Sequence, residues 1–194
     1  MTRKLLLDAG LDLFVSKGYA PTTVDDIASA AGTTRVTFYA YFPSKVDLMK
    51  ALISERLNAA LDRLPSGEHG STAWELVAVV EDGSRERIRA WLAAISERWD
   101  VIRPYTTTAF EAAAVDPDIR ALLDEWLNEA ISDVKEGLDR AGRFPAATRH
   151  FRSVIAITEL DHVARNWKPG TWGVERDQML DVLTESWLGS IGRH

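Results

Sequence analysis

Residues 18–45 decide the fold, and they read GYAPTTVDDIASAAGTTRVTFYAYFPSK. Two short stretches with helical periodicity are separated by Gly32 and a tight turn, which is the spacing of a helix-turn-helix. Thr22-Thr23 can cap the first helix, because a hydroxyl accepts a hydrogen bond from a free amide of the first turn. Ser44, followed three residues later by Asp47, predicts the start of another helix.

The second helix of this stretch, expected over about 34–41, has an inner and an outer set of side chains. Phe38 and Phe42 can pack against the preceding helix, whose small residues Ala28 and Ala31 permit a close crossing. Hydroxyls, guanidinium groups and phenols contact phosphates and base edges in a major groove. Lys45 adds a cation at a helix start, where phosphate is attracted. The predicted DNA-contact residues are Thr23, Thr34, Arg35, Thr37, Tyr39, Tyr41 and Lys45.

A structural role is the alternative for these residues. The threonines can serve only as helix caps and the tyrosines only as packing groups, although a cap hydroxyl such as that of Thr23 can also face phosphate. Phosphate is the commoner partner of an arginine, so Arg35 can contact either a phosphate or a base edge.

This segment resembles the DNA-binding domain of the tetracycline-repressor (TetR-like) family over about the first 55 residues. The family often has Gly where Val36 stands and His where Ala40 stands, and both positions lie on the recognition helix. An operator sequence is therefore not carried over. The shared pattern consists of Phe14, Lys17-Gly18-Tyr19, Thr22-Thr23-Val24, Ile27-Ala28, Ala31-Gly32 and the run from Thr37 to Lys45.

The resemblance implies a mechanism as well as a fold. Such proteins are homodimers whose last two long helices form a four-helix bundle with those of a partner. An effector enters a pocket in the larger domain, the two heads move apart, and the operator is released. Most members are repressors.

The remainder of the chain predicts further helices, so the expected fold class is all-α. The first helix ends at Lys17-Gly18 and carries Gly10 at an expected tight helix crossing; the fourth covers about 44–61. Short connections predict an antiparallel arrangement. A loop is expected at Leu64–Gly70. The later helices are expected at 72–81, from a cap at Ser84 to Ile102, from Pro104 onward, from Asp116-Pro117 to 141, at 146–166 and at 174–190.

Two domains are expected: a helix-turn-helix DNA-binding domain at 1–47 and a helical ligand-binding and dimerisation domain at 48–194. The last two helices carry more apolar residues than one bundle face needs, which indicates an interface. These residues are Phe151, Val154, Ile155, Ile157, Val163, Leu180, Leu183, Trp187 and Leu188.

Composition limits the possible functions. The chain has no cysteine, which excludes disulfides, thiol catalysis and thiolate zinc sites. Its net charge is -6, but residues 1–60 are net +1 and the rest net -7, a distribution that permits a basic DNA-binding face. Asp8 and Asp12 interrupt the first apolar run, and no run is long enough to span a bilayer. We therefore expect a cytoplasmic protein without a signal peptide or a membrane partner.

The seven tryptophans all follow residue 60. They can line a pocket for an apolar or aromatic effector, or they can belong to an ordinary core and dimer interface. The residues predicted to line a pocket are Trp91, Trp99, Tyr105, Phe110 and Trp126.

Enzymatic function is the principal rival. Glu159 and His162 have the Glu-x-x-His spacing of di-iron bundles, but such sites need a second copy, which the sequence lacks. His162 fits an interface or a pocket edge better. No nucleophile elbow or phosphate-binding glycine loop is present. We expect no catalytic residues, no metal and no cofactor. A DNA-binding accessory protein without a ligand is the other alternative, and it would have a solid effector domain.

Overall fold

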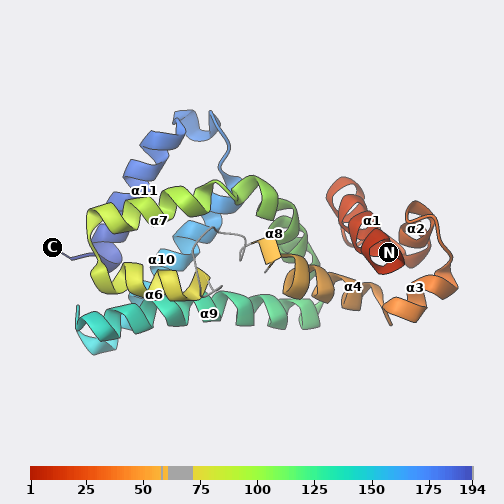
Figure 1. Cartoon of the computed structure of the whole chain (residues 1–194), viewed down its shortest axis with the longest axis horizontal. Helices are drawn as coiled ribbons and strands as arrows, with labels where there is room; N and C mark the ends of the chain where they lie inside the picture. Colours follow the sequence, from red (N-terminus) through yellow and green to blue (C-terminus); the bar gives the residue numbers. More distant parts are fainter. Residues whose placement is uncertain (58, 61–71, 194) are drawn as a thin grey trace. The chain divides into compact units, whose positions relative to one another are not determined.

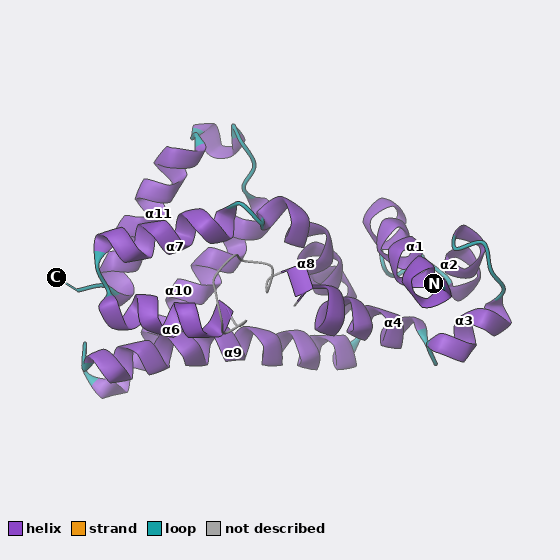
Figure 2. Ribbon diagram, in the orientation of Figure 1, coloured by secondary structure: helices purple, strands orange, loops and turns teal. Residues whose placement is uncertain are grey.

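The computed structural model describes residues 1–57, 59–60 and 72–193, and over these residues the backbone forms helices and loops without a strand (Figure 2). The all-α fold class is confirmed. The predicted loop at Leu64–Gly70 lies outside the described residues. The N-terminal elements are α1 (Thr2–Lys17), α2 (Val24–Ala30), α3 (Arg35–Tyr41), α4 (Lys45–Ala51) and the π-helix η1 (Leu52–Leu57) (Figure 1). The later elements are α6 (Thr72–Asp82), α7 (Arg85–Ser96), α8 (Trp99–Ala113), α9 (Pro117–Ala141), α10 (Ala146–Asn166), the 3-10 helix η2 (Thr171–Gly173) and α11 (Arg176–Ile191).

Two compact units divide the chain. Unit 1 contains Met1–Leu61 and Val101–Glu125, and unit 2 contains Asp62–Asp100 and Trp126–His194. The functional boundary expected between residues 47 and 48 stays a prediction. None of the described helices combines the length and the apolar character that a membrane crossing requires.

Buried side chains from α1 to α4 form the core of the N-terminal helices. In unit 1, α1 packs against α2 and α4, and α2 packs against α3. A Cβ placed on Gly10 would lie 2.7 Å from the Leu48 Cδ2 atom of α4. The predicted tight crossing at Gly10 is confirmed, because only the missing side chain leaves room for Leu48. The fully buried members of this core include Leu6, Phe14, Ile27, Phe38 and Leu48.

Hydroxyl caps begin each of the three short helices that follow α1. The Thr23 side chain accepts from the Asp26 amide and the Asp26 carboxylate accepts from the Thr23 amide, which completes a capping box. Thr34 caps α3, and Ser44 accepts from the Asp47 amide at 3.1 Å. The predicted caps at Thr23 and Ser44 are confirmed. Gly18 ends α1 with a φ of 91°, a conformation that glycine adopts without steric cost.

Aromatic pairs contribute to the core of unit 2. The rings of Trp91 and Trp187 stack with centroids 5.4 Å apart, and those of Trp99 and Trp167 meet edge to face at 6.1 Å. All four side chains are buried. The first pair joins α7 to α11, which are packed against each other.

The prediction that proline would start a helix at residue 104 was wrong. The helix capped by Ser84 ends at Ser96, and Pro104 lies inside α8, beyond its first turn. Proline in that position removes one intrahelical hydrogen bond. Burial outweighs this cost, because Trp99, Ile102 and Ala109 continue a buried helical pattern across the proline. At the α7 end, the Arg176 guanidinium donates to the Ala93 carbonyl and to Ser96 Oγ, both at 2.9 Å.

The prediction of one regular helix over about 44–61 was wrong at Leu52–Leu57, where the helix has π geometry. The helix changes to π geometry at Leu52, and the wider turn buries the adjacent residues Leu52 and Ile53 together with Leu57. Ala51, Leu52 and Ile53 are buried in succession, whereas an α-helix that packs through one face buries residues three and four apart.

Candidate nucleic-acid interface

Two buried phenylalanines orient helix α3. Phe38 and Phe42 are inaccessible, with ring centroids 5.9 Å apart. The side chains on the other faces remain accessible: Thr34 and Arg35 are exposed, Tyr39 and Tyr41 are 44% and 45% exposed, and Thr37 is partly exposed. The structure therefore brings five of the seven predicted DNA-contact residues together at one short helix.

Arg35 has partners inside the chain. Its guanidinium donates to an Asp25 carboxylate oxygen at 2.9 Å and to the Tyr39 hydroxyl at 3.3 Å, and it lies over the Tyr39 ring. The hydrogen bond to Tyr39 and the charge of Asp25 raise the pKa of Arg35 above its ordinary value. All of these groups are exposed, and an exposed ion pair contributes about 0–1 kcal/mol. Arg35 can therefore exchange Asp25 for a phosphate or a base edge at little cost.

Lys45 has a structural role that the sequence did not indicate. Its ammonium group donates to the carbonyls of Tyr19 at 2.8 Å, Ala20 at 3.2 Å and Thr22 at 2.9 Å, and it lies 4.2 Å from the centre of the Tyr19 ring. Burial lowers the pKa of Lys45. Because an ammonium has three protons, these bonds occupy all of its donors. Lys45 thus holds the α1–α2 loop, and its contact with phosphate stays a prediction.

Thr23 serves as a cap in an electrostatically reinforced turn. The Lys17 ammonium donates to Asp26 at 2.6 Å, and this bond, with the amide and hydroxyl of Thr23, lowers the pKa of Asp26 to about 2. The helix dipole also stabilises a negative charge in the first turn. The hydroxyl of Thr23 is committed to the Asp26 amide at 3.1 Å, and its contact with DNA stays a prediction.

Two apolar residues on α3 are also accessible, and neither was among the predicted DNA-contact residues. Val36 is 81% exposed and Ala40 is also exposed. The spacing of Phe38 and Phe42 predicts this exposure, because it fixes the inner side of the helix and hence the outer one.

The predicted pocket residues have different environments. Trp91 and Trp99 are buried in the ring pairs described above, whereas Tyr105, Phe110 and Trp126 are half-buried. Trp91, Trp99 and Trp126 belong to unit 2, and Tyr105 and Phe110 belong to unit 1. Packing explains the first two without a ligand, and the ligand-binding assignment of all five stays a prediction.

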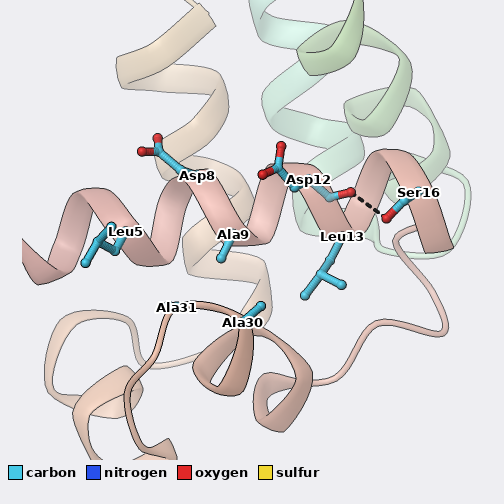
Figure 3. Close-up of a pocket in the computed structure, with 8 residues that line it drawn as sticks. All are labelled: Leu5, Asp8, Ala9, Asp12, Leu13, Ser16, Ala30 and Ala31. Carbon is cyan, nitrogen blue, oxygen red and sulfur yellow. Dashed lines mark hydrogen bonds between the residues drawn. The ribbon is translucent and has the colours of Figure 1, made fainter.

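A hollow of about 320 Å³ lies between α1 and the end of α2 (Figure 3). Leu5, Ala9 and Leu13 line one side, and Ala30 and Ala31 line the other. None of the residues predicted to contact DNA or effector lines it.

Glu159 and His162 of the Glu-x-x-His motif each contact a residue of another element. The Glu159 carboxylate accepts from the Ser186 hydroxyl at 2.8 Å, and burial raises its pKa. His162 stacks on Trp172 with centroids 6.3 Å apart. Within residues 1–57, 59–60 and 72–193, no group of three or more His, Asp or Glu side chains could hold a metal ion.

Only some of the apolar side chains of α10 and α11 are buried within the chain. Ile157, Leu180, Leu183 and Trp187 are buried within the chain. Phe151 and Val182, in contrast, are 66% and 68% exposed, and Ile155 is exposed on the same helix as Phe151. Apolar surface therefore remains on α10 and α11, although it is smaller than the sequence alone indicated.

The geometry of α2 and α3 defines a helix-turn-helix module, with the second helix anchored by phenylalanines and polar side chains facing outward. Comparison with known proteins identifies its type. Residues 6–52 match the sequence profile described as "Bacterial regulatory proteins, tetR family". The HTH-type transcriptional regulator SrpR of Pseudomonas putida is 38% identical over 80 residues, which are 40% of this chain and 37% of SrpR. The chain thus spans little more than a third of the length of this relative.

Solved structures extend the likeness to the whole fold. The TetR family transcriptional regulator PfmR from Thermus thermophilus has a TM-score of 0.67 at 18% identity, over 97% of this chain and 99% of PfmR. A SmeT–triclosan complex has a TM-score of 0.67 at 17% identity, over 99% of this chain and 92% of SmeT. The chain is TetR-like: its N-terminal segment carries the family's sequence pattern, and its fold is that of TetR-family regulators.

Proposed function

We propose that this protein is a transcriptional repressor that acts in the cytoplasm, binds pseudo-palindromic operator DNA as a homodimer and is released by a small apolar or aromatic effector. The observation that carries the proposal is the geometry of α3, in a segment that matches the tetR family profile. Thr34, Arg35, Thr37, Tyr39 and Tyr41 are accessible around a helix that buried Phe38 and Phe42 hold in place. Recognition helices read base edges with such groups.

In vitro selection from a random duplex library, with the full chain, tests this function. We expect enrichment of a symmetric sequence whose half-sites lie about one helical turn apart, since a two-fold symmetric dimer reads a symmetric site. Arg35→Ala should weaken binding and, if Arg35 reads a base, relax the preference at one position. Selection that enriches no common sequence would contradict the proposal.

Lys45 serves a second test of the same interface. Lys45→Ala should weaken binding to all duplexes about equally and lower the salt slope by about one unit, if Lys45 neutralises a phosphate. Lys45 also holds the α1–α2 loop, so a control at the same place is needed. Tyr19→Phe keeps both the Lys45 cation and the carbonyl to which it donates, and it should leave the salt slope at the wild-type value. Loss of affinity without a change in salt slope would leave Lys45 with the structural role alone.

Dimerisation is proposed through α10 and α11. Exposed Phe151, Ile155 and Val182 lie on these helices, and exposed apolar patches often mark interfaces. Sedimentation at micromolar concentration should give a dimer, and Phe151→Glu combined with Val182→Asp should give a monomer. Val15→Asp, a charge placed on the exposed valine of α1, should leave the dimer intact. A monomeric wild-type chain would contradict this proposal.

An effector is proposed to bind among the aromatic side chains of unit 2, Trp91, Trp99 and Trp126. Support comes from the similarity in fold to SmeT, whose structure is a complex with triclosan. Tyr105 and Phe110, in unit 1, stay as predictions from the sequence. Hydrophobic burial should dominate the affinity, at about 25 cal/mol per Å² of apolar surface before association costs.

Reciprocity tests the proposed release mechanism. An effector releases DNA only by preferring the form that does not bind DNA, so operator DNA must weaken effector binding by the same factor. Triclosan, used as a probe of this ligand class, is titrated into the free protein and into the operator complex while tryptophan fluorescence is followed. Tight binding with equal affinities in the two titrations would exclude this mechanism. No triclosan binding would leave a DNA-binding protein without this effector class.

A further inference from the structure

The face of α3 that points away from the core is apolar. Successive side chains on an α-helix are about 100° apart, so Phe38 and Phe42 together define the inner direction. Ala40 lies opposite to that direction, and Val36 lies about 40° from Ala40 around the helix. Val36 is 81% exposed and Ala40 is exposed. A row of two apolar residues therefore forms the centre of the outer face.

Polar side chains flank this apolar row on both sides. Arg35 and Tyr39, joined by a hydrogen bond of 3.3 Å, lie on one side. Thr37 and Tyr41, one turn apart, lie on the other. When such a helix enters a major groove, its outermost side chains face the base edges directly, and the flanking groups contact base edges or phosphates on either side of them.

Val36 has no evident role within the folded chain. A β-branched residue is a weaker helix former than alanine, and at 81% exposure Val36 gains little from burial. The isopropyl group is therefore available for a contact outside the chain. At the centre of a DNA-reading face, the groups nearest to such a side chain are base edges.

We propose that Val36 reads thymine, by packing its isopropyl group against the C5-methyl group in the major groove. The thymine methyl is the apolar feature in the major-groove pattern of the four base pairs, so an apolar side chain distinguishes it from hydrogen-bonding edges. The small side chain of Ala40 leaves room beside the contact. This inference rests on the proposed function, DNA binding through α3, and adds the base that the centre of the helix selects.

Substitution of deoxyuridine for thymine tests the contact, because it removes the methyl group and keeps every hydrogen-bonding group. Each thymine of the selected duplex is replaced in turn, at the same position in both half-sites, and Kd is measured by fluorescence anisotropy. For the wild-type chain we expect one position at which affinity falls about fifteenfold, or about fourfold per methyl group, the equivalent of about 0.8 kcal/mol each.

Val36→Ala, which removes the two γ-methyl groups, should lose most of this difference between the thymine and deoxyuridine duplexes at that position. This variant should fold, because it replaces an exposed valine with a better helix former. Val15→Ala, at the exposed valine of α1, is the matched control and should keep the full wild-type loss.

The outcomes separate this inference from the proposed function. Tight binding of the selected duplex with tolerance of deoxyuridine at every position would overturn the role of Val36 and leave the function in place. An equal loss in the wild type and in Val36→Ala would also overturn it. Failure to select any duplex would instead overturn the function on which the inference rests.

Discussion

The α1–α4 segment and the pair α10–α11 specify their structures in different ways. The helices α2, α3 and α4 are each seven residues long, and each begins at a hydroxyl cap, from Thr23, Thr34 and Ser44. The helix α10 has 21 residues, begins at Ala146 and follows Pro145, which provides no side-chain cap. Helices of seven residues are too short to be stable alone, so they depend on caps and on tertiary contacts. A long helix can depend on its apolar face alone.

This difference explains where relatives can be detected. Residues 6–52 match the family profile, whereas the whole chain resembles PfmR in fold at 18% identity. Caps, a tight crossing and a DNA-facing helix require particular residues at particular positions. A bundle helix requires only apolar residues at helical spacing, and many sequences satisfy that condition.

The largest expected effect concerns the anchor of α3. Phe38→Ala should lower the free energy of unfolding by about 3–5 kcal/mol, because it empties a fully buried site. Tyr39→Ala, at the adjacent exposed aromatic residue, should cost much less stability and still weaken DNA binding. Urea unfolding with anisotropy on the selected duplex measures both quantities. Equal losses of stability in the two variants would contradict the assignment of Phe38 as the buried anchor and Tyr39 as a DNA contact.

The second prediction concerns close packing in unit 2. A Cβ at Gly137 of α9 would lie 2.7 Å from the Val77 carbonyl oxygen and 2.6 Å from the Val80 Cβ atom, so the backbone would have to move. Gly137→Ala should cost about 1–3 kcal/mol despite the better helix propensity of alanine. At Gly189 the space is open, and Gly189→Ala should instead be stabilising. In thermal unfolding, the Tm of Gly137→Ala should lie below that of the wild-type chain and the Tm of Gly189→Ala above it.

The third prediction concerns the cap of α2. Thr23→Ala should cost about 1 kcal/mol, because it leaves the Asp26 amide without its hydroxyl acceptor. Thr23→Ser, which retains the hydroxyl, should recover most of that loss. Urea midpoints of the three chains decide the matter, and an unchanged midpoint in Thr23→Ala would mean that packing alone holds α2.

The smallest effect depends on pH. The pKa of Asp26 is lowered to about 2, chiefly by Lys17, so its contribution to stability is present above about pH 4. That contribution is lost as the pH falls through the folded-state value. Asp26→Asn should therefore flatten the decline in stability between pH 4 and pH 2, and Lys17→Ala should flatten it partly. A pH profile identical to that of the wild type would contradict the assigned pair.

The sequence predicted the first half of the structure well because its signals are local. The caps at Thr23 and Ser44, the crossing at Gly10 and the anchors Phe38 and Phe42 each follow from one residue and its near neighbours. Pro104 was misplaced because burial on both sides of it overrides a local helix-breaking signal. The bonds of Lys45 to three loop carbonyls and the π turn at Leu52 depend on tertiary contacts that a periodic pattern does not contain. The sequence marked Val36 only as a departure from the family pattern, because the residue types that predict DNA contacts are polar.

The measurement that tests the central claim most directly is the ratio of Kd values for a scrambled and a selected duplex, at about 0.15 M salt. If α3 reads the operator, the wild-type chain should prefer the selected duplex by at least about 1,000-fold. The combined variant Arg35→Ala and Tyr39→Ala should lose most of that preference and keep its affinity for the scrambled duplex within a few-fold. A ratio near one for the wild-type chain would contradict sequence reading by α3.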